Sequence, residues 1–271
     1  MNGEVGRFPR LRVVLVEPQY DGNLGQVARA MRNFGLFRLV LVAGDADPTA
    51  DEARWFGREE GLPILDAAVR VASLGDAIAD CADVIGCSRR SGKYRGTPQA
   101  PEQIWAEARP WSGNHETALV FGREAHGLST AELDLCHRVL SIPSDDACPS
   151  LNLAHAVAVV GYTLMCAQQG AVGASEEPRD DEAEPASSEQ IEGMFQHLRR
   201  VWYRIGYLNP QNPEAILRRW RRILHRGTMS VHDINVIRAM AHQTDYVAKL
   251  AKIPEGGPAE APEMFNKHQN R

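Results

Sequence analysis

The sequence predicts an α/β fold, in which a mostly parallel sheet is covered by helices on both faces and is followed by a small all-α module. Two β-branched runs, at 11–17 (LRVVLVE) and 37–43 (FRLVLVA), are typical of strands that are buried on both faces. Helical patterns lie between such runs, and this alternation indicates a parallel sheet. A sharp change of composition after Gly170 separates the sheet region from a helix-rich remainder.

The elements of the sheet region are expected in a regular order. Turn residues follow the first strand and lead into a helix from about 24 to 34, which Gly35 would end. A long helix over 151–168 carries small and apolar residues on most sides, so we expect it to be buried or to lie at an interface. Further strands are expected at 68–71, 84–87, 117–121 and 139–142, and further helices at 50–56, 74–80, 101–108 and 130–135.

The remainder of the chain divides by composition. We expect residues 1–170 to form the sheet domain and residues 171–188 to form a flexible acidic linker, because that segment holds six acidic side chains against one arginine. Residues 189–250 are expected to form the helical module, with Asn212 and Pro213 starting one helix and Ser230 with Asp233 starting the next. Ten basic and five acidic residues make this module positive. The segment 251–271, rich in Pro, Gly and Glu, is expected to be a disordered tail.

Composition excludes several classes of protein. The formal net charge is −5, so bulk basicity does not indicate a nucleic-acid partner, although local patches still can. Five cysteines without a Cys-x-x-Cys pair favour reduced thiols in a cytoplasmic protein over a disulfide framework. No apolar run is long enough to span a membrane, and the nine histidines show no metal-ligand spacing, so we expect neither a membrane span nor a metal site.

The first segment that could carry chemistry is 17–35 (EPQYDGNLGQVARAMRNFG). A glycine turn at Gly22 and Gly25 could present backbone amides to an anionic group, and Arg29 and Arg32 could bind phosphate. The alternative is a solvated helix face. Asp45 and Asp47, after the next strand, resemble the ribose-binding acid of dinucleotide folds, but the full G-x-G-x-x-G is missing.

Two further segments follow at 118–133 (ALVFGREAHGLSTAEL) and 141–164 (SIPSDDACPSLNLAHAVAVVGYTL). Gly122, at the end of a parallel strand, permits close backbone approach to a ligand. Ser150 stands where a helix N-cap is expected, and Asn152 in the first turn is either a helix residue or a hydrogen-bonding partner in a site.

The three segments together resemble the three motifs of the SPOUT methyltransferases, specifically the TrmH-like ribose 2′-O-methyltransferases. NLGQVARAMRNFGL, LVFGREAHGLS and SLNLAHAVAVVGY carry the resemblance, which covers roughly residues 11–168. The C-terminal stretch YLNPQNPEAILRRWRRIL is similar to the TrmJ branch of that family. The resemblance implies a C-terminal trefoil knot in the sheet domain, S-adenosylmethionine as cofactor, and a homodimer that methylates a cytidine or uridine ribose at position 32 of the tRNA anticodon loop.

The resemblance also implies roles for individual residues. Arg29 would be catalytic and would face the cofactor of the other subunit, with Asn23 positioning it and Ser150 and Asn152 closing the pocket. Because a guanidinium is effectively always protonated, we favour Arg29 as phosphate anchor and electrostatic stabiliser over a general base. The expected cofactor residues are Ser88, Gly122, Glu124, Gly127, Ile142, Pro143 and Leu151. The expected RNA-binding residues are Arg32, Arg89, Arg90, Lys93, Arg218, Arg219, Arg222 and Arg226.

Other functions stay open at this point. Within the enzyme class, a ribosomal RNA substrate is the nearest alternative to tRNA. A non-catalytic RNA-binding protein is a second alternative, although the retained polar residues of the three motifs argue against a loss of activity. An NAD-dependent oxidoreductase that uses Gly22, Gly25 and Asp45 is a third, and its missing fingerprint glycine counts against it.

Overall fold

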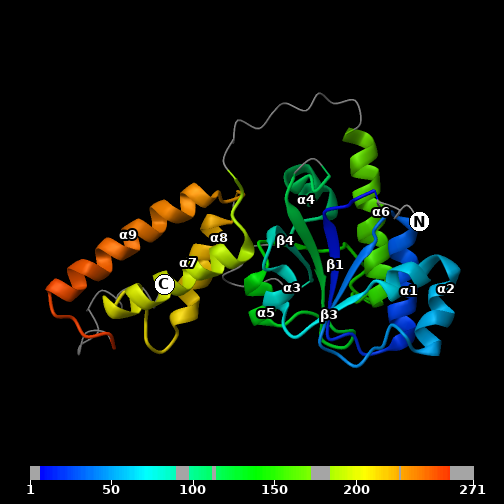
Figure 1. Cartoon of the computed structure of the whole chain (residues 1–271), viewed down its shortest axis with the longest axis horizontal. Helices are drawn as coiled ribbons and strands as arrows, with labels where there is room; N and C mark the ends of the chain where they lie inside the picture. Colours follow the sequence, from blue (N-terminus) through cyan, green and yellow to red (C-terminus); the bar gives the residue numbers. More distant parts are fainter. Residues whose placement is uncertain (1–6, 90–97, 112–113, 172–183, 226, 257–271) are drawn as a thin grey trace. The chain divides into compact units, whose positions relative to one another are not determined.

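The computed structural model describes residues 7–89, 98–111, 114–171, 184–225 and 227–256 (Figure 1). The chain divides into two compact units. The first unit carries a six-stranded sheet with helices α1 to α6, and the second carries helices α7, α8 and α9. Of the acidic linker expected at 171–188, residues 172–183 lie outside the described residues.

All strand pairs of the sheet are parallel, and the strand order is β3-β2-β1-β5-β4-β6. Strands β2 and β3 lie on one side of β1, and β5, β4 and β6 lie on its other side. The carboxyl ends of β1 and β5 therefore meet at a topological switch point, where open α/β sheets bind ligands. The α/β class predicted from the sequence is confirmed, and the trefoil knot that the resemblance implies stays a prediction. The strands are β1 Leu11–Val16, β2 Arg38–Val42, β3 Val69–Val71, β4 Cys81–Cys87, β5 Glu116–Phe121 and β6 Arg138–Leu140.

Helices cover both faces of the sheet (Figure 1). Successive side chains of β1 point to opposite faces, so Val13 and Leu15 join one apolar core and Val14 and Val16 join the other. The first core contains residues of α1, α2, α4 and α6, and the second contains residues of α3 and α5. These helices are α1 Asp21–Asn33, α2 Asp51–Asp66, α3 Leu74–Ile78, α4 Pro101–Ala108, α5 Thr130–Leu135 and α6 Leu153–Ala171.

The expected glycine turn before the first helix is absent, because α1 begins at Asp21 and both glycines lie inside it. A Cβ on Gly25 would lie 2.1 Å from the Ala53 carbonyl oxygen, and one on Gly22 would lie 2.8 Å from the Glu52 carboxylate. Both glycines therefore let α1 and α2 pack closely, and neither forms a phosphate-binding turn. Because that turn is missing, the basis for a dinucleotide site is removed. Asp47 accepts local hydrogen bonds from the amide and hydroxyl of Thr49.

Helix α2 is longer than the expected 50–56 and is kinked. It continues to Asp66 across Arg58, whose backbone has φ 53° and ψ −177°. Gly57 and Pro63 are residues that often accompany a break in a helix, but the sequence does not indicate that the arginine at 58 takes the positive φ while Gly57 stays helical.

The second unit has its own apolar core, formed by α7 Ser188–Arg204, α8 Pro213–Leu224 and α9 Val231–Leu250. Ser187 with Gln190 and Ser230 with Asp233 form capping boxes, the second as the sequence predicts. Asn212 occupies the N-cap position of α8 but makes no side-chain cap hydrogen bond.

Described residues on both sides of the expected module 189–250 also contact its helices. The Ala186 amide donates to the Met229 carbonyl at 2.8 Å, and the Arg204 guanidinium donates to the Ile253 carbonyl at 2.6 Å. The two hydrogen bonds hold the end of the expected linker and the start of the expected tail against the helices. They also give the backbone and guanidinium groups involved the partners that buried polar groups need. At the other end of the linker, Ala171 belongs to α6. Among the described residues no helix is long and apolar enough to cross a membrane.

Candidate active site

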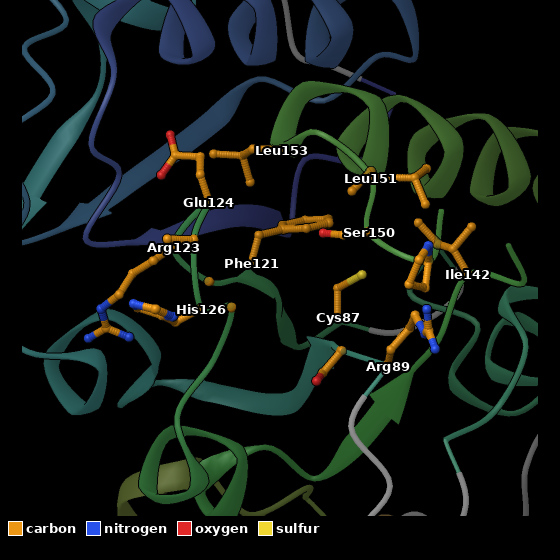
Figure 2. Close-up of a pocket in the computed structure, with 16 residues that line it drawn as sticks. Cys87, Arg89, Phe121, Arg123, Glu124, His126, Ile142, Ser150, Leu151 and Leu153 are labelled. Carbon is orange, nitrogen blue, oxygen red and sulfur yellow. The ribbon is translucent and has the colours of Figure 1, made fainter. Parts of the chain in front are cut away.

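A cavity of about 440 Å³ lies at the carboxyl edge of the sheet (Figure 2). Its walls are the ends of β4 and β5, the loops that follow these two strands, the loop between β6 and α6, and the start of α6. Figure 2 shows Phe121, Cys87 and Ser150 near the centre of the lining. The lining residues are Cys87, Ser88, Arg89, Phe121, Gly122, Arg123, Glu124, Ala125, His126, Gly127, Ile142, Pro149, Ser150, Leu151, Leu153 and Ala156.

Six of the seven residues expected to bind the cofactor line this one cavity. They come from three separate loops, and they are Ser88, Gly122, Glu124, Gly127, Ile142 and Leu151. The seventh, Pro143, is exposed and does not line it, because the chain turns outward after Ile142 and returns to the cavity at Pro149.

The glycines of the second motif shape the loop after β5. A Cβ on Gly122 would lie 2.1 Å from the Gly127 carbonyl carbon, so only glycine allows the two ends of this loop to approach each other. Gly127 has φ 62°, and a Cβ on it would meet no atom within 4 Å. Its backbone is therefore open toward the space of the cavity.

A chain of hydrogen bonds joins the three sequence motifs. The Asn152 amide Nδ2 donates to Asn23 Oδ1 at 2.9 Å, and Asn23 Nδ2 donates to Glu124 Oε1 at 3.0 Å. The backbone amide of Gln19 donates to the other carboxylate oxygen of Glu124 at 3.2 Å. Three residues that the resemblance places in the site are thus held by one another, and Glu124 is held in place where it lines the cavity.

Ser150 lines the cavity but does not cap α6, contrary to the expectation. Asn152 occupies that position, because its Oδ1 accepts from the Ala154 amide at 2.9 Å and its carbonyl accepts from the Ala156 amide. The loop ahead of it keeps Ser150 outside the helix and exposed, two residues before the cap.

Arg123, which lines the cavity, was not among the predicted site residues. Its guanidinium donates to both oxygens of Glu17 at 2.6 and 2.7 Å and to both oxygens of Glu132 at 2.9 and 3.0 Å. The arginine thereby ties the end of β1 to the start of α5 across the end of β5. The signal available in the sequence was an acid directly after one buried strand and a base two residues after the end of another.

We expect this clamp to make stability fall in acid. Hydrogen bonds from Arg123 lower the pKa of Glu17. Burial alone would raise the pKa of Glu132, but hydrogen bonds from Arg123 and the Ser129 amide lower it overall. Carboxylates with lowered pKa contribute stability above the ordinary carboxyl pKa of about 4.3, and that contribution is lost as the pH falls below it. Denaturant unfolding from pH 7 to pH 3 should show a smaller loss for Glu132→Gln than for the wild type, and equal losses would contradict the clamp.

Cys87, at the wall of the cavity, is not a nucleophile at neutral pH. Burial raises the pKa of its thiol to about 12, so it stays protonated. We expect thiol-labelling reagents at pH 7.5 to modify the exposed Cys148 and Cys166 and to leave Cys87 unmodified in the folded protein. Labelling of Cys87 at the rate of the exposed pair, read by peptide mass spectrometry, would contradict this.

The predicted cationic residues are distributed over several places. Arg29 is exposed on α1 and does not line the cavity of its own chain. Arg32 stacks over the Phe37 ring at 4.7 Å, and Arg89 lines the cavity. Arg218 is half-buried on α8, whereas Arg219 and Arg222 are exposed there. Arg90, Lys93 and Arg226 lie outside the described residues.

The cavity fits a small, partly apolar cofactor. Its volume lies within the range of about 300–1,000 Å³ that is usual for small-molecule sites. Phe121, Ile142 and Leu151 supply apolar surface, and Ser88 and Glu124 supply polar groups at its wall. An adenosine with a charged amino-acid tail combines a flat apolar ring with polar ends, which is the combination this lining suits.

Comparisons with known proteins agree with this geometry. Residues 10–162 match the model of the SpoU rRNA Methylase family, and residues 189–253 match the model of the tRNA methyltransferase TrmJ, C-terminal domain. The tRNA (cytidine/uridine/adenosine-2′-O-)-methyltransferase TrmJ of Pseudomonas aeruginosa (strain UCBPP-PA14) is 36% identical over 248 residues, which are 89% of this chain and 95% of the relative. The crystal structure of TrmJ from Z. mobilis ZM4 has a TM-score of 0.71 and 28% identity, over 86% of this chain and 98% of that one.

The parallel sheet, the cavity at its carboxyl edge and the family match define the class: the chain belongs to the SpoU methylase family and is a methyltransferase. The match extends through both units. Within the family, the chain belongs with the TrmJ methyltransferases, because its helical unit matches the TrmJ C-terminal model as well.

Proposed function

We propose that this protein transfers a methyl group from S-adenosylmethionine to a ribose 2′-hydroxyl of tRNA, at the pyrimidine in position 32 of the anticodon loop. The observation that carries the proposal is the hydrogen-bond chain Asn152–Asn23–Glu124, which joins all three motifs and holds Glu124 at the cavity. The names of the TrmJ relatives, which are tRNA (cytidine/uridine-2′-O-)-methyltransferases or act also on adenosine, support the substrate. With tRNA as substrate, we propose that the reaction takes place in the cytoplasm.

The proposed reaction requires no covalent bond between the protein and the substrate. The bound cofactor supplies an electrophilic methyl group on a sulfonium. The protein would align the ribose hydroxyl with it and exclude water, and alignment of this kind is worth about 7–11 kcal/mol. The ribose oxygen bonds to the methyl carbon as the carbon–sulfur bond breaks, the neutral thioether leaves, and the hydroxyl proton passes to water or to a phosphate oxygen. The Asn152–Asn23 pair holds the loops that frame the cavity, and Ser150 presents its hydroxyl there. The protonated Cys87 thiol fits a direct transfer without a covalent enzyme intermediate.

Arg29 would act from a second copy of the chain. Its side chain lies on an exposed face of α1, whereas Asn23 of the same helix reaches the cavity region. Residues 23 and 29 are six positions apart, about one and two-thirds turns of helix, so their side chains point about 120° away from each other. A homodimer in which Arg29 meets the partner's cavity would complete the site. The exposed stripe His155, Tyr162 and Cys166 on α6 supplies a surface for this contact.

The test is a map of 2′-O-methylated positions in total RNA from cells with and without the gene. We expect loss of methylation at position 32 of several tRNAs, and purified protein with S-adenosylmethionine should restore it. Loss confined to ribosomal RNA would support the ribosomal alternative instead. No change in any RNA would contradict the proposal.

A further inference from the structure

A second groove, of about 640 Å³, lies on the α1–α2 surface of the first unit. It shares no lining residue with the cavity at the sheet edge. Neither the family motifs nor the proposed mechanism assigns a role to its α2 side. The lining residues are Arg29, Arg54, Trp55, Arg58, Glu59, Glu60 and Leu62.

The groove contains an exposed tryptophan. Trp55 is 63% exposed, although indole is among the largest apolar side chains and contributes most when it is covered. The Arg58 guanidinium carbon lies 4.7 Å from the centre of the Trp55 ring, within the range of a cation–π contact. The two side chains thus form a flat, cationic platform at the surface.

The backbone under this platform is strained. Arg58 has φ 53° and ψ −177°, a conformation that is essentially confined to glycine. A glycine at this position would relieve the strain, yet the chain carries the arginine that stacks on Trp55. Strain of this kind is concentrated at functional sites, where the surrounding structure imposes it.

Two cations of the groove are available to a ligand. Arg29 and Arg58 make no ion pair with any acid in the described part of the chain. Arg54, by contrast, is paired with Asp66 at 2.6 Å. Glu59 and Glu60 line the same groove and would repel an anion that approached them.

We infer that this groove binds unpaired nucleotides of the substrate RNA, with a base stacked on Trp55 and phosphates held by Arg58 and Arg29. The inference rests on the proposed function, because it names the part of the substrate that this surface takes. Unstacked bases of RNA loops are recognised by stacking on aromatic rings and guanidinium planes, and the phosphates beside them bind arginine. An exposed indole that stacks with arginine, next to a further unpaired arginine, supplies both contacts.

The experiment measures the dissociation constant of the full-length protein for an anticodon stem-loop RNA and for a fully paired, two-strand RNA duplex. Trp55→Ala should weaken stem-loop binding about 10-fold, as expected for the loss of one stacked base. Trp55→Phe should keep most of the affinity, because the ring can still stack. The control Val69→Ala, which removes an exposed apolar side chain elsewhere, should leave binding unchanged. Binding of the duplex should not change when Trp55 is substituted.

Charge variants test the phosphate contact. Arg58→Gly should weaken stem-loop binding and reduce the salt slope by about 0.7 log units per log unit of salt, while the melting temperature stays equal or rises because the strained backbone is relieved. Glu59→Gln changes the groove charge in the opposite direction and should strengthen binding. A merely structural Arg58 would show a change in melting temperature without a change in salt slope.

The outcomes separate this inference from the proposed function. If the wild type methylates tRNA but Trp55→Ala and Arg58→Gly bind the stem-loop as well as the wild type, the inference is overturned and the proposed function stands. If Trp55→Ala dissociates an oligomer in light scattering, the groove is a contact between subunits and the inference is again overturned. If the wild type methylates no RNA, the proposed function fails, and the binding measurements still decide what the groove does.

Discussion

Arg29→Ala should reduce methyl transfer to tRNA by about 100- to 1,000-fold while the affinity for S-adenosylmethionine stays within error of the wild type. The rate effect is the size expected when one electrostatic contact to a developing oxyanion is removed. Cofactor affinity should be unaffected because Arg29 lies outside the cavity of its own chain. Arg29→Lys should also be impaired, since an ammonium does not reproduce a planar two-pronged contact. Single-turnover kinetics and calorimetry measure the two quantities.

A mixing experiment tests whether Arg29 acts across a dimer. Gly122→Val should close the cavity, because the Cβ alone would lie 2.1 Å from the Gly127 backbone. Co-expression of this variant with Arg29→Ala should restore activity, since a mixed dimer then contains one cavity and one Arg29 that are both intact. If the mixture stays inactive although mixed dimers form, Arg29 acts within its own chain. Loss of cofactor binding by Arg29→Ala would contradict the division of roles.

The strands and most helices were predictable because their signals are local. The β-branched runs at 11–17 and 37–43 became β1 and β2, and the six-residue α5 was placed at its observed bounds. The glycines of the first motif were misread, because close helix packing and a tight turn call for the same residue. Only the approach of Ala53, which is distant in sequence, distinguishes the two.

The sequence allowed most residues of the cavity to be predicted, but not the contacts between their side chains. Motif resemblance selected six residues that line one cavity. One partner of Arg123 is Glu17, which is 106 positions away, and no sequence pattern records such a pairing. Whether Arg29 lines the cavity likewise depends on the rotation of α1 about its axis relative to the sheet, which the sequence does not indicate. The same holds on α8, where the side chain of Leu217 is buried and the equally apolar side chain of Ile223 is 46% exposed.

Removal of residues 172–271 should weaken tRNA binding strongly while the remaining domain keeps its fold and its affinity for S-adenosylmethionine. Each unit has separate apolar cores, and none of the core residues of the helical unit belongs to the cores of the sheet. The cavity is lined entirely by the first unit. Circular dichroism and calorimetry check the retained fold and cofactor binding, and filter binding at several salt concentrations checks the affinity for tRNA.

The salt dependence identifies which arginines of the helical unit contact RNA. Arg219 and Arg222 are exposed on α8, whereas Arg221 is bound by Glu192 and stacks on Phe195. The double variant Arg219→Ser, Arg222→Ser should lower the salt slope by about 0.7–0.9 for each phosphate contact that is lost, and the truncation should lower it by at least as much. Arg199→Ser is the matched control, because that arginine is paired with Glu214 at 3.0 Å. A truncated protein with the salt slope of the full chain would assign RNA binding to the arginines of the sheet domain.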